Sequence, residues 1–260
     1  MPRILVTNDD GVQSEGIHAL AQALAPLGDV IIVAPTQEAS AIGHALTLRR
    51  PLRLETSAAN VFAVDGTPTD CVNVAIAHVL HGKPDLIVSG INKGWNLGDD
   101  VTYSGTVSGA LEGALLGIPS IAISTENHRR KYEFEFGPSA EAARTVAEAV
   151  MEQGMPRFAL LNINVPFGPN RGFRATVQAR RNHVTVVDKR IDPRGSPYYW
   201  IEEGENNWEP HDRSDYQAVR DGYISITPLQ PDMTAHEAMA YVEQLQVTAS
   251  ARTSARTSAR

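Results

Sequence analysis

Residues 3–35 read "RILVTNDDGVQSEGIHALAQALAPLGDVIIVAP", with one apolar run at each end of the stretch. The runs "RILVT" and "DVIIVAP" show no polar alternation, which is typical of strands buried on both faces. Between the runs, apolar residues recur at helical spacing and a glycine ends the pattern: Ile17, Leu20, Leu24, Leu27 and Gly28. A strand, a helix and a second strand in this order predict two parallel strands joined by a right-handed crossover.

The same alternation continues to about residue 167. Further buried strands are predicted at 84–90, 119–125 and 158–166, and helices at 67–80, 104–117 and 138–154. In the helix at 67–80, Thr67 or Thr69 can serve as the N-cap and Pro68 suits the first turn. Residues 45–56 and 60–66 are expected to be strands that pair as a ribbon. The predicted fold class is therefore α/β, with a mostly parallel, doubly wound sheet.

The pattern changes after Pro169. Residues 172–201 alternate with period two and predict antiparallel strands outside the main sheet, either as an arm that contacts another subunit or as an ordinary sheet edge. Residues 215–229 are expected to form a turn and a strand, and 234–247 a last helix. We divide the chain into a sheet-forming domain at 1–170, an oligomerisation arm and helix at 171–248, and a tail at 249–260. The tail ends in "SARTSARTSAR", which has no apolar face and is expected to be disordered.

Composition limits the class of protein. The chain has 260 residues, a net charge of −7 and 42% hydrophobic residues, which argues against a nucleic-acid binder with a broad basic surface. Its single cysteine, Cys71, allows no intrachain disulfide and is expected in the core. We find neither a signal peptide nor a long apolar run, so a cytoplasmic location is expected.

Polar and small residues follow four of the predicted strands, in "TNDDG", "APTQEASAIGH", "SGINKGWNLGDD" and "STENH". In a doubly wound sheet these carboxyl ends meet at one edge, where ligands bind. Asp9 and Asp10 supply two hard oxygen ligands that suit Mg²⁺, Mn²⁺ or Ca²⁺. The alternative is structural, with one aspartate capping a helix and the other forming a turn before Gly11.

Residues 89–109 join a buried strand to a helix through a glycine-rich loop. Asn92 and Asn96 offer amide oxygens there. The run Ser104, Gly105 and Thr106 precedes the helix, where free N–H groups and two hydroxyls could hold a phosphate. Ser104 could instead be only an N-cap. The chain has neither a P-loop nor a dinucleotide fingerprint.

Residues 38–47, "EASAIGHALT", add two further candidates. Ser40 could be an oxygen ligand of a metal or a loop cap, and His44 could be a general acid or an ordinary loop histidine. No G-x-S-x-G elbow surrounds any serine, which argues against an α/β-hydrolase triad.

These stretches together resemble the SurE (stationary-phase survival protein E) family. The resemblance is carried by "ILVTNDDG" (4–11), "IIVAP" (31–35), "GTPTDCV" (66–72), "SGINKGWNLGDDVTYSGTVSGALEG" (89–113) and "NINVP" (162–166). It is dense over 3–170 and looser beyond. It implies a Rossmann-like domain and a C-terminal arm exchanged between subunits of a homodimer or homotetramer.

The resemblance also implies a phosphatase that needs one divalent metal ion per subunit, Mg²⁺ or Mn²⁺. Its substrates would be nucleoside 5′- and 3′-monophosphates, and short polyphosphate is a further candidate. Carried over by position, the metal ligands fall on Asp9, Asp10, Ser40 and Asn92. The phosphate would be met by Asn8, Asn96, Ser104, Gly105 and Thr106. Apart from the resemblance, Asp9 and His44 are the two candidates for the group that takes the proton from water.

The chain departs from the family pattern before Ser40, where Thr36, Ala39 and Gly43 replace the usual acidic residue, arginine and serine. Those changes bear on base or sugar selectivity. Two other classes of function share the same metal and anion site. One is a phosphotransferase, which needs an acceptor pocket, and the other is a nucleotide sensor without turnover.

Overall fold

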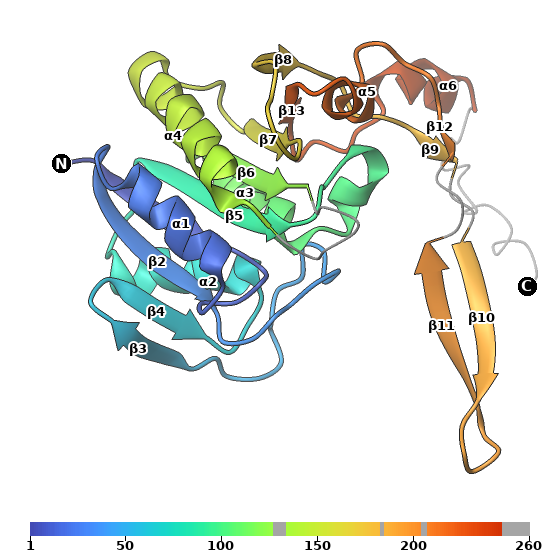
Figure 1. Cartoon of the computed structure of the whole chain (residues 1–260), viewed down its shortest axis with the longest axis horizontal. Coiled ribbons are helices and arrows are strands. Elements are labelled where there is room, and N and C mark those ends of the chain that lie inside the picture. Colours follow the sequence, from blue (N-terminus) through green and yellow to red (C-terminus); the bar gives the residue numbers. More distant parts are fainter. Residues whose placement is uncertain (127–133, 183–184, 204–206, 246–260) are drawn as a thin grey trace, which may run out of the picture.

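The protein is described by a computed structural model over residues 1–126, 134–182, 185–203 and 207–245 (Figure 1). Its centre is a nine-stranded sheet in the order β3-β4-β2-β1-β5-β6-β7-β13-β8. The strands from β4 to β7 in that order run parallel, which confirms the predicted fold class. Their bounds are β1 Arg3–Thr7, β2 Asp29–Pro35, β4 Val61–Val64, β5 Leu86–Lys93, β6 Ser120–Thr125 and β7 Leu160–Val165.

Helices cover both faces of the sheet (Figure 1). On one face, α1 (Glu15–Leu24) and α4 (Phe136–Gln153) pack on a core that includes Ile4 and Val6 of β1. On the other face, α2 (Pro68–Val74) packs around Leu5, and α3 (Gly105–Leu115) lies beside it. Successive residues of β1 therefore point into different cores, which explains why the sequence of this strand is apolar throughout.

Local chemistry sets where the helices of the second face begin. The hydroxyl of Thr67 accepts a hydrogen bond from the amide of Asp70, while the Asp70 carboxylate accepts one from the amide of Thr67. This capping box, with Pro68 in the first turn, starts α2, which continues as a π-helical segment over Ala75–Val79. Ser104 caps α3 by accepting from the amide of Val107.

One edge of the sheet differs from the sequence prediction. Strand β3 covers only Leu54–Ala58 and pairs antiparallel with β4, so the ribbon is present but the strand expected over residues 45–53 is wrong. The partner strand β4 is short, and its last residue, Val64, pairs with Leu54. Residues before Leu54 therefore have no ladder to join, and Pro51 lacks an amide hydrogen.

The C-terminal part extends the other edge. Strand β13 (Ile224–Leu229) pairs antiparallel with β7, and β8 (Phe173–Ala175) pairs parallel with β13. Strands from both sides of residue 170 thus share one sheet, and the domain division at that residue stays a prediction. A helix, α5 (Asp215–Arg220), replaces the expected turn because Ser214 caps it.

A hairpin of β10 (Thr185–Ile191) and β11 (Pro197–Glu203) lies outside the main sheet, as predicted, and projects away from it (Figure 1). Strands β9 (Arg181–Asn182) and β12 (Asn207–Trp208) pair near its base. The predicted last helix is shorter than expected, with a 3-10 turn at His236–Ala238 followed by α6 (Met239–Gln244). The predicted disordered tail lies outside the described residues. In the described ranges, no helix is both long and apolar enough to cross a membrane.

Candidate active site

Asp9 and Asp10 follow β1 at the carboxyl edge of the sheet, between β2 and β5. Asp9 is 5% exposed and lies against the N-terminus of α3, where the hydroxyl of Thr106 donates a hydrogen bond to its Oδ1. Gly105 makes this approach possible, because a Cβ at that position would lie 2.7 Å from the Cβ of Asp9. The fold therefore brings the start of α3, the candidate phosphate-binding segment, into contact with Asp9.

The negative charges of Asp9 and Asp10 are only partly balanced by other groups of the protein. Burial and, to a smaller extent, the charge of Asp10 raise the pKa of Asp9 to about 6, although the hydrogen bond from Thr106 opposes this. Burial also raises the pKa of Asp10, which the positive charge of Lys93 partly offsets and the charge of Glu38 increases. A cation at this edge would relieve the cost of burying and pairing these charges.

Ser40 is exposed on the loop that follows β2, and the loop comes close to both aspartates. The amide of Ala39 donates to the carbonyl oxygen of Asp9 at 2.7 Å. The hydroxyl of Ser40 donates to Oε1 of Glu38 at 2.6 Å. That donation uses the Ser40 hydrogen and leaves oxygen lone pairs for a cation. Glu38 was missed from the sequence, although it stands two residues before Ser40.

Asn92 lies on β5, the strand beside β1. The amide of Lys93, the next residue, donates to Oδ2 of Asp10 at 3.3 Å. The Asn92 side-chain nitrogen donates to the carbonyl of Gly94 at 2.9 Å, which fixes the amide group and leaves its oxygen as an acceptor. The pairing of β5 with β6 shifts register between Ser89 and Asn92, and such an irregularity re-aims side chains at the end of a strand.

The oxygen donors at this edge fit a hard divalent cation. Two carboxylates, a hydroxyl and an amide oxygen match the preference of Mg²⁺ and Mn²⁺, and none of these donors is a thiolate or imidazole. Within the described residues, no three or more His, Cys, Asp or Glu side chains are grouped so that they could hold a metal ion. A metal here would therefore rest on two carboxylates supplemented by neutral oxygens.

Asn8 and Asn96 are tied into the protein by their own hydrogen bonds. The Asn8 amide exchanges hydrogen bonds with the backbone of Gly11 at 3.0 and 3.2 Å and so holds the turn that carries the aspartates. The Asn96 nitrogen Nδ2 donates to Ser124 at 2.8 Å. The backbone carbonyl of Asn96 accepts hydrogen bonds from the side-chain amides of Asn162 and Asn164, at 2.8 and 3.1 Å. The "NINVP" motif thus anchors the loop after β5 on β7.

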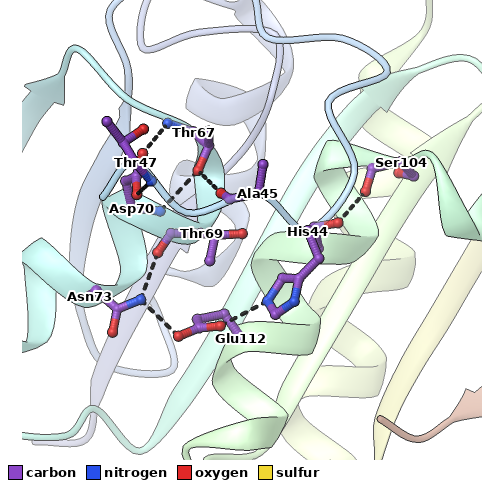
Figure 2. Close-up of polar contacts among 10 residues, drawn as sticks. His44, Ala45, Thr47, Thr67, Thr69, Asp70, Asn73, Ser104 and Glu112 are labelled. Carbon is purple, nitrogen blue, oxygen red and sulfur yellow. Dashed lines mark hydrogen bonds and ion pairs between the residues drawn. The ribbon is translucent and has the colours of Figure 1, made fainter. Parts of the chain in front are cut away.

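His44, which sequence reasoning left between a general acid and a loop histidine, is bonded to a residue that was missed. Its Nε2 lies 2.8 Å from Oε2 of Glu112 on α3 (Figure 2). Asn73 of α2 donates to Oε1 of the same carboxylate at 2.7 Å. The signal available in the sequence was a single glutamate within the small and apolar run "GTVSGALEGAL".

Known proteins are similar to this chain in sequence and in structure. The model of the family described as "Survival protein SurE" matches residues 4–185. A protein of Syntrophotalea carbinolica named 5′-nucleotidase SurE is 50% identical over 89% of this chain and 92% of its own. One of the same name from Geotalea daltonii is 48% identical over 94% of this chain and 99% of its own. The crystal structure of the SurE protein from Aquifex aeolicus, 42% identical, superposes with a TM-score of 0.83 over 94% of this chain and 99% of that one.

Proposed function

Because this chain belongs to the SurE family, whose matched relatives are 5′-nucleotidases, we propose that it hydrolyses nucleoside monophosphates with a divalent cation bound at Asp9 and Asp10. The observation that carries the metal is the pair of adjacent carboxylates, of which Asp9 is buried and Asp10 is half-buried. Burial raises the pKa of both groups, and Lys93 offsets this for Asp10 only in part. A bound cation would compensate both charges at once.

We assign one Mg²⁺ or Mn²⁺ ion to each subunit, with Ser40 and Asn92 as the neutral ligands. Support comes from the neighbours of these two residues, since Ala39 bonds Asp9 and Lys93 bonds Asp10. When bound, the cation supplies charge stabilisation to the phosphate oxygens and lowers the pKa of a coordinated water.

The protein itself binds and orients the phosphate at the start of α3. The amide of Gly105 belongs to the first turn of that helix, where N–H groups lack partners within the helix and favour an anion. The hydroxyl of Ser104, whose oxygen caps the helix by accepting from the amide of Val107, lies at the same turn and is a second proposed phosphate contact. Thr106 holds Asp9 in place through its hydroxyl.

Asn8 and Asn96 act through the loops that they hold. Asn8 fixes the turn of the aspartates, and Asn96 fixes the loop that leads from Asn92 to Ser104. Asp9 is the proposed proton acceptor from water, because its carboxylate lies against the start of α3, where the phosphate is proposed to bind. His44 is a weaker candidate because its Nε2 is already bonded to Glu112.

The proposed substrate range covers nucleoside 5′- and 3′-monophosphates and short polyphosphate. We also propose a cytoplasmic location and a homodimer or homotetramer joined through the β10–β11 hairpin. The support for assembly is the exposure of large apolar side chains on that hairpin, among them Tyr199, Trp200 and Ile201.

The test is phosphate release from a panel of nucleoside 5′- and 3′-monophosphates and tripolyphosphate, with Mg²⁺, Mn²⁺ or a chelator. Release that requires metal supports the proposal. Binding of nucleotide without release would indicate a sensor. Consumption of nucleotide that converts an added alcohol to its phosphate ester, in place of free phosphate, would indicate a phosphotransferase.

A further inference from the structure

The loop that carries Ser40 is held by polar contacts instead of packing. Residues 36–53 connect β2 to β3 and contain no helix or strand. None of the side chains from residue 36 to residue 50 is buried. Leu52, near the end of the loop, packs against the core, but the part that carries Ser40 has neither an apolar anchor nor a strand partner. That part is expected to open easily unless specific hydrogen bonds restrain it.

Backbone groups of the loop make several such bonds. The amide of Gly43 donates to the carbonyl of Tyr103 at 3.0 Å. The carbonyl of Ala45 accepts from the hydroxyl of Thr67 at 2.8 Å, and the amide of Thr47 donates to Asp70 at 2.9 Å (Figure 2). These hydrogen bonds connect the middle of the loop to the start of α2 and to the segment that leads into α3.

His44 adds a side-chain bond from the loop to a buried partner. The side chain of Glu112 is 9% exposed, and its two oxygens meet His44 at 2.8 Å and Asn73 at 2.7 Å. Burial raises the pKa of Glu112, but the hydrogen bonds from His44 and Asn73 outweigh it, so the net pKa lies below the ordinary value. The carboxylate is therefore ionised near neutral pH.

A buried carboxylate is a costly choice at this point of α3. An apolar side chain would pack between α2 and α3 without the desolvation that a charge requires. The neighbours of Glu112 on the helix are small or apolar, including Gly109, Leu111 and Gly113. The glutamate therefore serves a purpose other than packing, and its bond to the loop supplies one.

We propose that His44 and Glu112 form a latch that holds the Ser40 loop on α3 and so positions Ser40 beside Asp9 and Asp10. The ring of His44 turns toward Glu112, whereas Ser104, at the start of α3, lies on the other side of the His44 backbone (Figure 2). His44 and Glu112 are thus positioning residues, and they act on the site through the loop. This inference rests on the proposed metal site.

The test compares His44→Phe and Glu112→Leu with the wild-type protein. Each variant replaces a polar side chain with an apolar one of comparable size, so the bond between positions 44 and 112 is lost. Lys83→Met is the matched control, because Lys83 donates to the carbonyl of Leu116 at the far end of α3. Melting temperature and circular dichroism establish that each variant folds. A Glu112→Gln variant keeps hydrogen-bonding groups toward Asn73 and His44.

Hydrogen–deuterium exchange of the peptide 36–53, measured with chelator, reports loop opening without any metal. A lost hydrogen bond to a charged group predicts about 10- to 100-fold faster exchange in the two latch variants. Lys83→Met should match the wild type, and Glu112→Gln should recover most of the protection. Unchanged exchange in the latch variants would overturn the latch, and so would a Glu112→Gln variant as fast as Glu112→Leu.

Calorimetry with Mn²⁺ alone then links the loop to the site. Loss of a residue that supports a metal ligand predicts about 10- to 100-fold weaker Mn²⁺ binding in His44→Phe and Glu112→Leu. Faster exchange with unchanged Mn²⁺ affinity would contradict positioning of Ser40. Absence of Mn²⁺ binding by the wild type would instead overturn the proposed metal site, while the exchange result would still decide whether the latch exists.

Discussion

Thr106 donates a hydrogen bond from its hydroxyl to Oδ1 of Asp9, and this contact joins the end of β1 to the first turn of α3. The two residues are far apart in the sequence. Their contact orients a buried carboxylate at the start of the helix. The bare backbone of Gly105 makes room for it. The position of Asp9 is therefore set by α3 as much as by its own strand.

Thr106→Val tests that orientation. Valine keeps the β-branched shape and removes the donor, so Asp9 loses its restraint while the helix stays intact. We expect kcat to fall about 10- to 1000-fold, the range seen when one preorganised donor is lost. Steady-state kinetics on a nucleoside monophosphate measures the effect.

Two further variants make this result specific. Thr106→Ser restores the hydroxyl and should recover most of kcat. Thr145→Val removes a helical hydroxyl on α4 that donates to the carbonyl of Glu141, and it should leave both kinetic constants unchanged. If Thr106→Val raises only KM, the hydroxyl serves ground-state binding. If it lowers only the melting temperature, Thr106 has no role in the reaction.

Asp10→Asn should weaken divalent-metal binding and reduce turnover at limiting metal by at least about 100-fold, because a charged ligand becomes a neutral one. Isothermal calorimetry with Mn²⁺ measures the affinity directly. Asp29→Asn, which removes an exposed carboxylate at the opposite end of β2, is the charge-matched control. Wild-type affinity in Asp10→Asn would show that the cation binds elsewhere.

Asp9→Asn should make the metal-free protein more stable at neutral pH. Burial raises the pKa of Asp9 from 3.8 to about 6, so the ionised form is less favourable in the folded than in the unfolded protein. The free energy of unfolding therefore falls as pH rises through this window and stays low above it. Asparagine does not titrate, so the variant avoids a loss on the order of 3 kcal/mol.

Urea unfolding in chelator at pH 4 and pH 8 tests this sign. The gain from Asp9→Asn should be small at pH 4 and close to its full size at pH 8. An equal difference at both pH values would show that the carboxylate is not strained by burial. Added Mn²⁺ at pH 8 should stabilise the wild type and leave Asp9→Asn nearly unchanged, because the variant lacks the charged ligand.

The hairpin should mediate assembly through one face. Its register places Val187 opposite Ile201, and Tyr199 falls on the same face two residues along β11. Ile201 is 78% exposed, so Ile201→Asp should disrupt a subunit contact with little effect on the fold of one chain. Sedimentation velocity at micromolar concentration should show a smaller species than the wild type. Arg194→Ser, in the hairpin turn, is the control, and a monomeric wild type would contradict the assembly.

The succession of strands along the chain from β1 to β7 could be predicted, apart from the start of β3, because the apolar runs are bounded by helix caps, glycines or prolines. Thr67, Pro68 and Ser104 mark helix starts by local chemistry alone. The register of β8 and β13 could not be predicted. Strand β13 pairs with β7, and β8 pairs with β13. The alternation in "ISITPL" does not show which strand will be the partner of β13. Residues 45–53 were misassigned because β propensity says nothing about whether a partner strand is present.

Some residues of the candidate site could also be predicted from the sequence, and others could not. Asp9 and Asp10 stand out as adjacent carboxylates after a buried strand. Glu38 and Glu112 do not, because their partners lie on other segments and only the folded chain brings them together. Asn8 and Asn96 stood out as polar residues at strand ends, and the structure shows their side chains bonded within the protein. A sequence pattern identifies polar residues at an edge, whereas contacts decide which of them face a ligand.

Phosphate release from adenosine 5′-monophosphate tests metal-dependent hydrolysis most directly. The wild-type protein is stripped with chelator and assayed, and then Mg²⁺ or Mn²⁺ is restored, with Asp10→Asn assayed in parallel. We expect no release from the stripped protein, full recovery when metal is restored, and little recovery in Asp10→Asn. Release that persists in the stripped protein, or equal recovery in Asp10→Asn, would contradict a reaction that depends on a cation at Asp9 and Asp10.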